Sequence, residues 1–340
     1  MRPSLVSLVL LLLVAAPAGA ASPRPLRTDL PPRTTGSLGA DVVHGPVARA
    51  ARAGTERALL RTGDGTTVRV ELSPRYAGSG VAAAQSYVDF LGALTHGPEL
   101  ARLRVYLAPP DEVRALCGGG HRAFAACYAP SRAEMIVPGE EIAPVAGIST
   151  AYAVTHEYGH HVAAHRDARP FAAVRSGPRY WSSFERVCAR TAAGELARGD
   201  YLRDPGENWA EAYARLRWPS EPWRYAPVLA PSGGALAAVR RDVVDPWTAP
   251  RERRFAGTLS ERAARRAVTL PLRLDGRVTL AFDGPRGAHV ALMDGRKVLA
   301  RGRSGAAMTA CRTRPSERLR VVVTRGAASG RFTLVARYPG

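Results

Sequence analysis

Residues 149–165 have the sequence STAYAVTHEYGHHVAAH, and the expected architecture of the chain follows from this stretch. Ser149 and Thr150 are both good N-caps, and the small and apolar residues that follow predict a single helix that continues to Arg166. Residues four apart on a helix project from the same face, one above the other. The stretch therefore predicts a helix on which histidines four residues apart lie on one face.

His156 and His160 have this spacing, so their imidazoles can bind one metal ion. Glu157 lies about 100° further around the helix, where it can reach a water on the metal as a general base. This is the His-Glu-x-x-His arrangement of zinc metallopeptidases. The alternative is a helix with two partly exposed histidines and a solvated glutamate. The apolar neighbours Val154 and Val162 argue against it, because buried imidazoles side by side need a partner.

A second helix is expected to supply the third ligand. Asp204 followed by Pro205 is a good helix start. Glu207 and Glu211 then lie four apart, where two carboxylates repel each other unless a positive charge lies beside them. One Zn²⁺ ion would supply this charge, with Glu207 as ligand and Glu211 orienting a histidine N–H. A capping box, in which Glu207 bonds back to the cap, is the alternative. Other carboxylates that could complete the site instead are Asp167, Glu185, Glu195 and Asp200.

A histidine as third ligand would need glycine at position 163 and histidine at position 166. The chain has Ala163 and Arg166 there, and His165 is one residue out of phase. No methionine follows the helix at a distance that fits a Met-turn. The sequence therefore disfavours this ligand set.

With these residues in place, the chain resembles a zincin of the gluzincin type, in which a later helix supplies a glutamate ligand. The segment ENWAEAY at residues 207–213 is similar to the glutamate helix of the anthrax lethal factor group. The resemblance covers roughly residues 66–216. It implies an α+β, zincin-like catalytic domain with a small twisted sheet, an active-site helix and a glutamate helix. It also implies metal ligands at His156, His160 and Glu207, with Glu157 as general base.

In such families a tyrosine or histidine near the glutamate helix often stabilises the oxyanion. Tyr201 is the nearest match, and Tyr213 competes with it. The expected function is that of a secreted zinc-dependent peptidase acting on a protein or peptide substrate, with Glu157 taking the proton of a metal-activated water. The alternative is a non-catalytic exported zinc-binding or cell-envelope attachment protein with a degenerate peptidase fold. The intact Glu157 favours the enzyme. His161 and His165 are expected to be solvated or to lie behind the ligands.

The first 20 residues are typical of a secretory signal peptide: Arg2, an apolar run over 5–16 and a small-residue cleavage site at 18–20. Residues 21–60 lack periodicity and predict a flexible leader or propeptide, in which His44 is solvated. No later stretch has enough consecutive apolar residues to span a membrane. The mature protein is expected to be extracellular, in contact with the cell wall if it is retained.

Four cysteines without Cys-x-x-Cys spacing favour two disulfides in an oxidising compartment over a cysteine zinc site. Three pairings are possible. Cys117 and Cys127 would close a short glycine-rich loop, which leaves Cys188 to pair with Cys311. The alternative is that the four are buried free thiols.

The chain is strongly basic, with a formal charge of +19, or +18 once Arg2 is removed with the signal peptide. Arginine is spread along the whole chain, and no nucleic-acid motif is present. Nucleic acid is therefore not expected as a partner. A basic surface would instead attract anionic cell-wall polymers, membrane headgroups or acidic substrates.

Residues 61–250 form the expected catalytic domain. Alternation and helical spacing predict, before the metal helix, a strand over 66–72, a helix over 81–94, a strand over 103–107, a helical turn over 111–116 and extended pieces over 127–130 and 133–137. Residues 133–137 are a candidate edge strand that could pair with a substrate backbone, although an interior position is equally compatible with the pattern.

The C-terminal region, residues 255–340, predicts a small all-β sandwich after a polar join over 246–254. Strands are expected over 268–274, 278–282, 289–293, 297–300, 319–324 and 332–338. This pattern weakly resembles the pre-peptidase C-terminal domains of secreted bacterial peptidases. His289 alternates within a strand and is expected to be structural.

Overall fold

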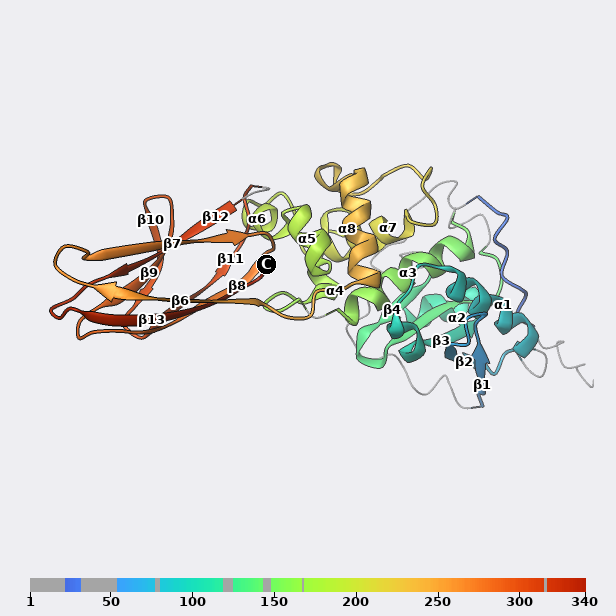
Figure 1. Cartoon of the computed structure of the whole chain (residues 1–340). Coiled ribbons are helices and arrows are strands. Elements are labelled where there is room, and N and C mark those ends of the chain that lie inside the picture. Colours follow the sequence, from blue (N-terminus) through green and yellow to red (C-terminus); the bar gives the residue numbers. More distant parts are fainter. Residues whose placement is uncertain are drawn as a thin grey trace, which may run out of the picture.

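The computed structural model describes residues 22–31, 54–76, 80–118, 125–142, 148–166, 168–314 and 317–340. Over these ranges the chain is a mixed α+β protein with one five-stranded and two four-stranded sheets. Figure 1 shows the five-stranded sheet at one end, the two four-stranded sheets at the other, and helices between them. The expected signal peptide, His44, most of the glycine loop after Cys117 and Asp167 lie outside the described residues.

The five-stranded sheet has the order β1-β2-β3-β5-β4. Its outer pairs are antiparallel, whereas β2, β3 and β5 run parallel to one another. The strand bounds are Glu56–Arg61 (β1), Thr67–Leu72 (β2), Arg104–Ala108 (β3), Cys127–Ala129 (β4) and Glu134–Pro138 (β5). The expected strands are thus present within a few residues, and β1 is an addition that begins inside the predicted leader.

Helices cover both faces of this sheet. On one face, α1 (Gly80–Ala93) and α3 (Thr150–Ala164) pack on the strands and form the main hydrophobic core. On the other face, α2 (Pro110–Leu116) covers a smaller cluster that includes the disulfide between Cys117 and Cys127. The sheet is therefore a rigid platform on which the histidine-bearing helix α3 is fixed.

The edge role that the sequence offered for residues 133–137 is wrong. The strand β5 lies inside the sheet, between β3 and β4, and β4 occupies the edge. All five residues of β5 are buried, as expected for a strand with neighbours on both sides and cover on both faces.

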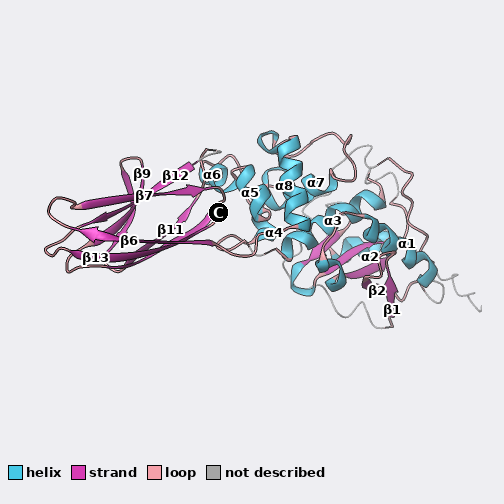
Figure 2. Cartoon of the chain, in the orientation of Figure 1, coloured by secondary structure: helices cyan, strands magenta, loops and turns pink. Residues whose placement is uncertain are grey.

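A group of helices follows α3 and links the sheet to the C-terminal region (Figure 2). Their bounds are Ala173–Ser176 (α4), Arg179–Phe184 (α5), Val187–Ala192 (α6), Pro205–Ala214 (α7) and Gly233–Val244 (α8). The described part of the chain contains no helix that is both long and apolar enough to cross a bilayer. The long α8, which the sequence analysis missed, packs against α5 and α7.

The C-terminal region is a β-sandwich of two antiparallel sheets, ordered β10-β9-β12-β7 and β11-β8-β13-β6. Its side chains form a separate hydrophobic core between the sheets. The strands are Arg251–Leu259 (β6), Arg265–Leu272 (β7), Gly276–Asp283 (β8), His289–Asp294 (β9), Lys297–Gly302 (β10), Gly305–Ala310 (β11), Glu317–Thr324 (β12) and Gly330–Tyr338 (β13). Two of them, β6 and β11, were not expected, and β6 begins inside the predicted join.

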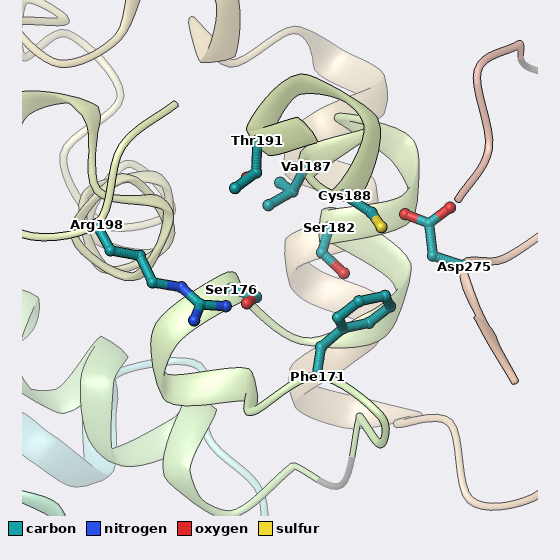
Figure 3. A pocket seen from close by; sticks show the side chains of 8 residues that line it. All are labelled: Phe171, Ser176, Ser182, Val187, Cys188, Thr191, Arg198 and Asp275. Atoms are coloured by element: carbon teal, nitrogen blue, oxygen red, sulfur yellow. The ribbon is translucent and has the colours of Figure 1, made fainter. Parts of the chain in front are cut away.

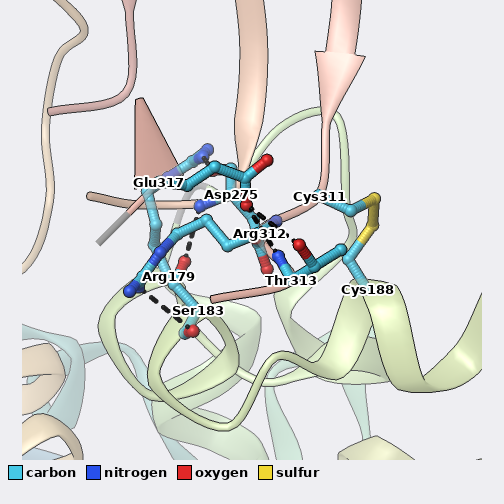
Figure 4. The surroundings of a disulfide bond; sticks show 8 residues. All are labelled: Arg179, Ser183, Cys188, Asp275, Cys311, Arg312, Thr313 and Glu317. Carbon is cyan, nitrogen blue, oxygen red and sulfur yellow. Dashed lines mark hydrogen bonds between the residues drawn. A yellow bond between two sulfur atoms is a disulfide. The ribbon is translucent and has the colours of Figure 1, made fainter. Parts of the chain in front are cut away.

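A covalent and polar junction ties the sandwich to the helices (Figure 4). Cys188 and Cys311 form the second disulfide, so both pairs favoured by the sequence are confirmed. Beside it, the N–H of the buried Asp275 donates to the Ser183 hydroxyl oxygen at 2.8 Å, and the Asp275 Oδ1 accepts from the N–H of Arg312 at 2.6 Å. The Arg179 guanidinium donates to the Asp275 carbonyl oxygen. The helices and the sandwich therefore share a buried hydrogen-bond network.

Part of the predicted leader packs on the folded chain. Residues 22–31 are extended, and the N–H of Arg24 donates to the Gly139 carbonyl at 2.7 Å. The N–H of Leu26 donates to the Ser86 hydroxyl at 2.7 Å, and the Leu26 side chain packs against the main core. This stretch is anchored rather than flexible.

Candidate metal centre

The helix α3 begins where the sequence placed it and is buried for almost its whole length. The Ser149 hydroxyl caps it by accepting from the N–H of Tyr152 at 3.3 Å. Every residue from Thr150 to Ala163 is buried, and His156, Glu157 and His160 each have 0% exposure. This excludes the alternative of a surface helix with solvated histidines.

The helix α7 lies directly against α3, and a glycine permits the contact. A Cβ at Gly159 would lie 2.9 Å from the Ala210 Cα and 3.2 Å from its carbonyl oxygen, so only glycine fits without a shift. The Trp209 indole N–H donates to the Gly159 carbonyl at 2.9 Å and fixes the register of the two helices. The small residues at the contact thus bring the glutamates of α7 to the histidines of α3.

Three side chains from the two helices converge. One ligand atom each of His156, His160 and Glu207 lies within 4.8 Å of the others. The Glu207 Oε2 is 3.4 Å from the His156 Nε2 and 3.3 Å from the His160 Nε2. Two donors held at about 2.1 Å from one ion with tetrahedral angles are about 3.4 Å apart. A direct charge-assisted hydrogen bond would be shorter, about 2.7–2.9 Å. The spacing therefore fits three ligands of one metal ion.

The charge state of Glu207 suits this role. Burial would raise the pKa of its carboxyl, but the neighbouring His160 and His156 outweigh burial and lower the pKa below its ordinary value. Glu207 is only 6% exposed, so its carboxyl group lies in an almost dry site. A buried negative charge beside two histidines favours a cation between them.

Glu211 lies behind one of the histidines, as predicted. Its Oε2 is 3.2 Å from the His156 Nδ1, and it is 1% exposed. If Nδ1 donates to this carboxylate, Nε2 keeps its lone pair and faces Glu207. The corresponding Nδ1 of His160 is buried without a hydrogen-bond partner in the part of the chain that the structure describes. The two histidines thus differ in how firmly their rings are oriented.

The capping-box alternative for Glu207 is not what the structure contains. The Asp204 Oδ1 caps α7 by accepting from the N–H of Gly206 at 2.8 Å, whereas the Glu207 carboxylate faces the histidines. Two of the other candidate carboxylates pair with arginines away from the cluster: Glu195 with Arg190 and Asp200 with Arg203.

The predicted oxyanion residue Tyr201 belongs to a pair of phenols. Its hydroxyl is 2.6 Å from the hydroxyl of Tyr225, and the Tyr225 ring stacks on His156 with centroids 6.2 Å apart. Tyr225, which the sequence analysis missed, is thus the phenol in contact with the cluster. It lies in an irregular segment after α7 and carries no motif. The competing Tyr213 instead donates to the Thr95 carbonyl at 2.5 Å.

The histidines after the cluster have other surroundings. His161 was expected to be solvated or to lie behind the ligands, yet it is fully buried between the Tyr128 hydroxyl (3.1 Å) and the Glu99 carbonyl (2.9 Å). Burial lowers the pKa of His161 to about 3, so its imidazole is neutral. His165 is half-buried, and its Nδ1 lies 2.9 Å from the His161 carbonyl. Neither residue joins the metal cluster.

A separate small cavity lies beside the junction with the sandwich. It has a volume of about 90 Å³ and is drawn in Figure 3 with its lining residues, among them Ser182, Cys188 and Asp275. The three clustered ligands do not line it. This cavity is therefore distinct from the metal centre.

Comparison with known proteins adds little to this geometry. No family model matches the sequence, and no curated protein matches it. Among solved structures, a mitogen derived from Yersinia pseudotuberculosis aligns with 26% of this chain and 86% of its own, at 10% identity and a TM-score of 0.21. A likeness this distant carries no argument about fold or function.

Proposed function

We propose that this chain is an exported zinc-dependent peptidase of the gluzincin type. The single observation that carries the proposal is the convergence of Glu207 with His156 and His160, at 3.4 and 3.3 Å, across two helices. The buried Glu157 follows the first histidine on the same helix, where a general base is needed. The β-sandwich would be an accessory domain.

The donor set supports zinc as the metal. Two imidazole nitrogens and one carboxylate oxygen are the protein ligands of many catalytic zinc sites, which keep a fourth position open for water or substrate. Metals such as Ca²⁺ and Mg²⁺ prefer oxygen ligands alone. The contact of His156 with Glu211 provides the outer carboxylate that such sites use to orient a ligand.

Different residues of the chain would have different roles in hydrolysis. A zinc ion held by the three ligands would act as a Lewis acid toward water and the scissile carbonyl. Glu157 would accept a proton from the attacking water and return it to the amine nitrogen that leaves. The Tyr225 hydroxyl, oriented by Tyr201 at 2.6 Å, would donate a hydrogen bond to the developing oxyanion.

The two disulfides support export. Disulfides persist in oxidising compartments, and Cys117–Cys127 and Cys188–Cys311 are both formed. The signal-peptide pattern of the first 20 residues supports the same route.

The proposal is tested by zinc stoichiometry and by hydrolysis of casein or a peptide library, with wild type compared with Glu157→Gln. Wild type should bind one zinc and cleave, whereas Glu157→Gln should bind one zinc and lose nearly all activity. Glu195→Gln, an exposed carboxylate paired with Arg190, is the matched control and should behave as wild type. One zinc without any Glu157-dependent hydrolysis would favour a non-catalytic zinc-binding protein.

The ligand set is tested separately. His156→Ala and Glu207→Ala should each abolish stoichiometric zinc binding, because each removes one of three protein ligands. Loss of zinc in the first variant with full retention in the second would assign the third ligand to another residue.

A further inference from the structure

A basic groove opens on the five-stranded sheet, away from the metal centre. It has a volume of about 590 Å³, and four arginines line it: Arg69, Arg102, Arg104 and Arg132. We call this the basic groove. Its lining contains no acidic side chain within the described ranges. His165, which also lines it, lies five residues beyond the nearer clustered histidine, His160, or about 7.5 Å further along the helix direction, and none of the three clustered side chains lines the groove. The groove therefore belongs to neither the metal cluster nor the proposed catalytic machinery.

The strand register places two of the arginines next to each other on neighbouring strands. Leu59 of β1 is opposite Arg69 of β2, Arg69 is opposite Arg104 of β3, and Arg104 is opposite Glu134 of β5. Register partners point to the same face, and neighbouring strands lie about 4.8 Å apart. Arg102 lies two residues before the first residue of β3 and adds a further guanidinium at the same end of the strands. The groove thus presents several guanidinium groups close together.

These charges are poorly compensated within the protein. Arg132 contacts the buried Glu134 at 3.3 Å, but its Nη1 is buried without a hydrogen-bond partner in the described ranges. Over the same ranges, Arg69, Arg102 and Arg104 make no ion pair. Like charges directly opposite on adjacent strands destabilise a sheet, and Glu134 flanks this pair on the Arg104 side alone, so an anion bound beside Arg69 would relieve the remaining repulsion. The sheet therefore tolerates a repulsion that a ligand would relieve.

We propose that the basic groove binds a linear polyanion, whose successive oxyanion groups pair with Arg69, Arg102 and Arg104. Guanidinium groups bind phosphate and carboxylate through two parallel hydrogen bonds, which suits an arginine-only site. A concave groove admits a chain, whereas a membrane presents a broad flat surface. Among the described residues no Phe, Tyr or Trp lines the groove, so the bases of a single-stranded nucleic acid would have only the His165 ring to stack on. The inference does not depend on the proposed peptidase activity.

The test measures binding of long-chain inorganic polyphosphate to the full chain by fluorescence anisotropy at several NaCl concentrations. Arg69→Gln combined with Arg102→Gln, both exposed residues, should weaken binding about tenfold or more at low salt and reduce the salt slope by about 1 to 2. Arg266→Gln with Arg277→Gln, two exposed arginines of the sandwich, makes the same change in net charge and should leave binding unchanged. Equal loss in both pairs, or no binding by wild type, would overturn the proposal.

Two further arms separate the sources of the anion. Orthophosphate should compete only at much higher concentration than the polymer, because it contacts one or two guanidiniums at a time. The groove variant should bind vesicles of anionic phospholipid as strongly as wild type does. Binding to vesicles that depends on Arg69 and Arg102, without binding to the polymer, would refute a chain-binding groove and indicate a membrane surface. Unfolding temperature and zinc content of each variant establish that the fold and the metal site are intact.

Discussion

With zinc at the proposed site, replacing Glu207 by glutamine should remove most of the stabilisation that the metal gives the folded chain. The carboxylate is 6% exposed and its Oε2 lies 3.4 and 3.3 Å from the two histidine nitrogens. Glutamine keeps the shape of the side chain but has no charge to offer the metal. The fold should therefore survive while the affinity for zinc falls.

The size of the effect follows from mass action. At free zinc of about 100 times the wild-type Kd, binding stabilises the folded state by about 2.7 kcal/mol. Loss of an outer partner of a metal ligand already weakens binding about 10–100-fold, so loss of a direct ligand should weaken it by at least about 100-fold. The same zinc concentration then equals the Kd of the variant, and the stabilisation falls to about 0.4 kcal/mol. Zinc should therefore raise the unfolding temperature of wild type by about 5–11 °C and that of the variant by about 1–2 °C.

Tryptophan fluorescence is a suitable probe, because all five tryptophans lie between positions 181 and 247, outside the β-sandwich. Melting curves with zinc and with chelator give the zinc-dependent shift for wild type, Glu207→Gln and the control Glu195→Gln. The control should keep the wild-type shift. If Glu207→Gln also keeps it while His156→Ala loses it, the assignment of Glu207 as a ligand is refuted.

Four further predictions concern the surroundings of the site. Glu211→Gln should weaken zinc binding about tenfold and the alanine variant about 100-fold in a chelator competition, and equal affinity for all three proteins would contradict its orienting role. Gly159→Ala should destabilise the chain by about 1–3 kcal/mol in urea, because the new Cβ would lie 2.9 Å from a backbone carbon of α7; an unchanged midpoint would contradict the tight contact. Tyr225→Phe should reduce kcat about 10–100-fold with zinc binding intact, and unchanged kinetics would remove it from the mechanism. Burial raises the pKa of Asp242 to about 7, so its contribution to the unfolding free energy is greatest below about pH 4 and declines towards pH 7; Asp242→Asn should flatten this decline, and parallel pH profiles of both proteins would refute it.

The two helices of the candidate site could be predicted because their signals are local. The caps Ser149 and Asp204 and the spacing of His156 and His160 act within a single turn or two of helix. Their convergence depends on a contact between segments 50 residues apart, which the sequence indicates only indirectly through Gly159. Tyr225 could not be predicted, since a loop residue has no periodicity to mark the direction of its side chain.

The errors in the β regions have a similar cause. The side chains of β6 are mostly exposed and those of β11 are small, so neither strand shows the alternation that identified its neighbours. The position of β5 inside the sheet is decided by its hydrogen-bond partners, β3 and β4, which its own residues do not specify. Local patterns identified most strands, whereas their neighbours depend on the tertiary fold.

The bridge between Cys188 and Cys311 bears on any attempt to study the part with the histidine cluster alone. A chain truncated before Arg251 would leave the Cys188 thiol without its mate and would uncover Ser183 and Arg179, which now hold Asp275. In an oxidising medium such a thiol is prone to join a second molecule, so a covalent dimer would form and mimic natural self-association. A chain shortened in this way therefore also needs Cys188 replaced by a residue without a thiol.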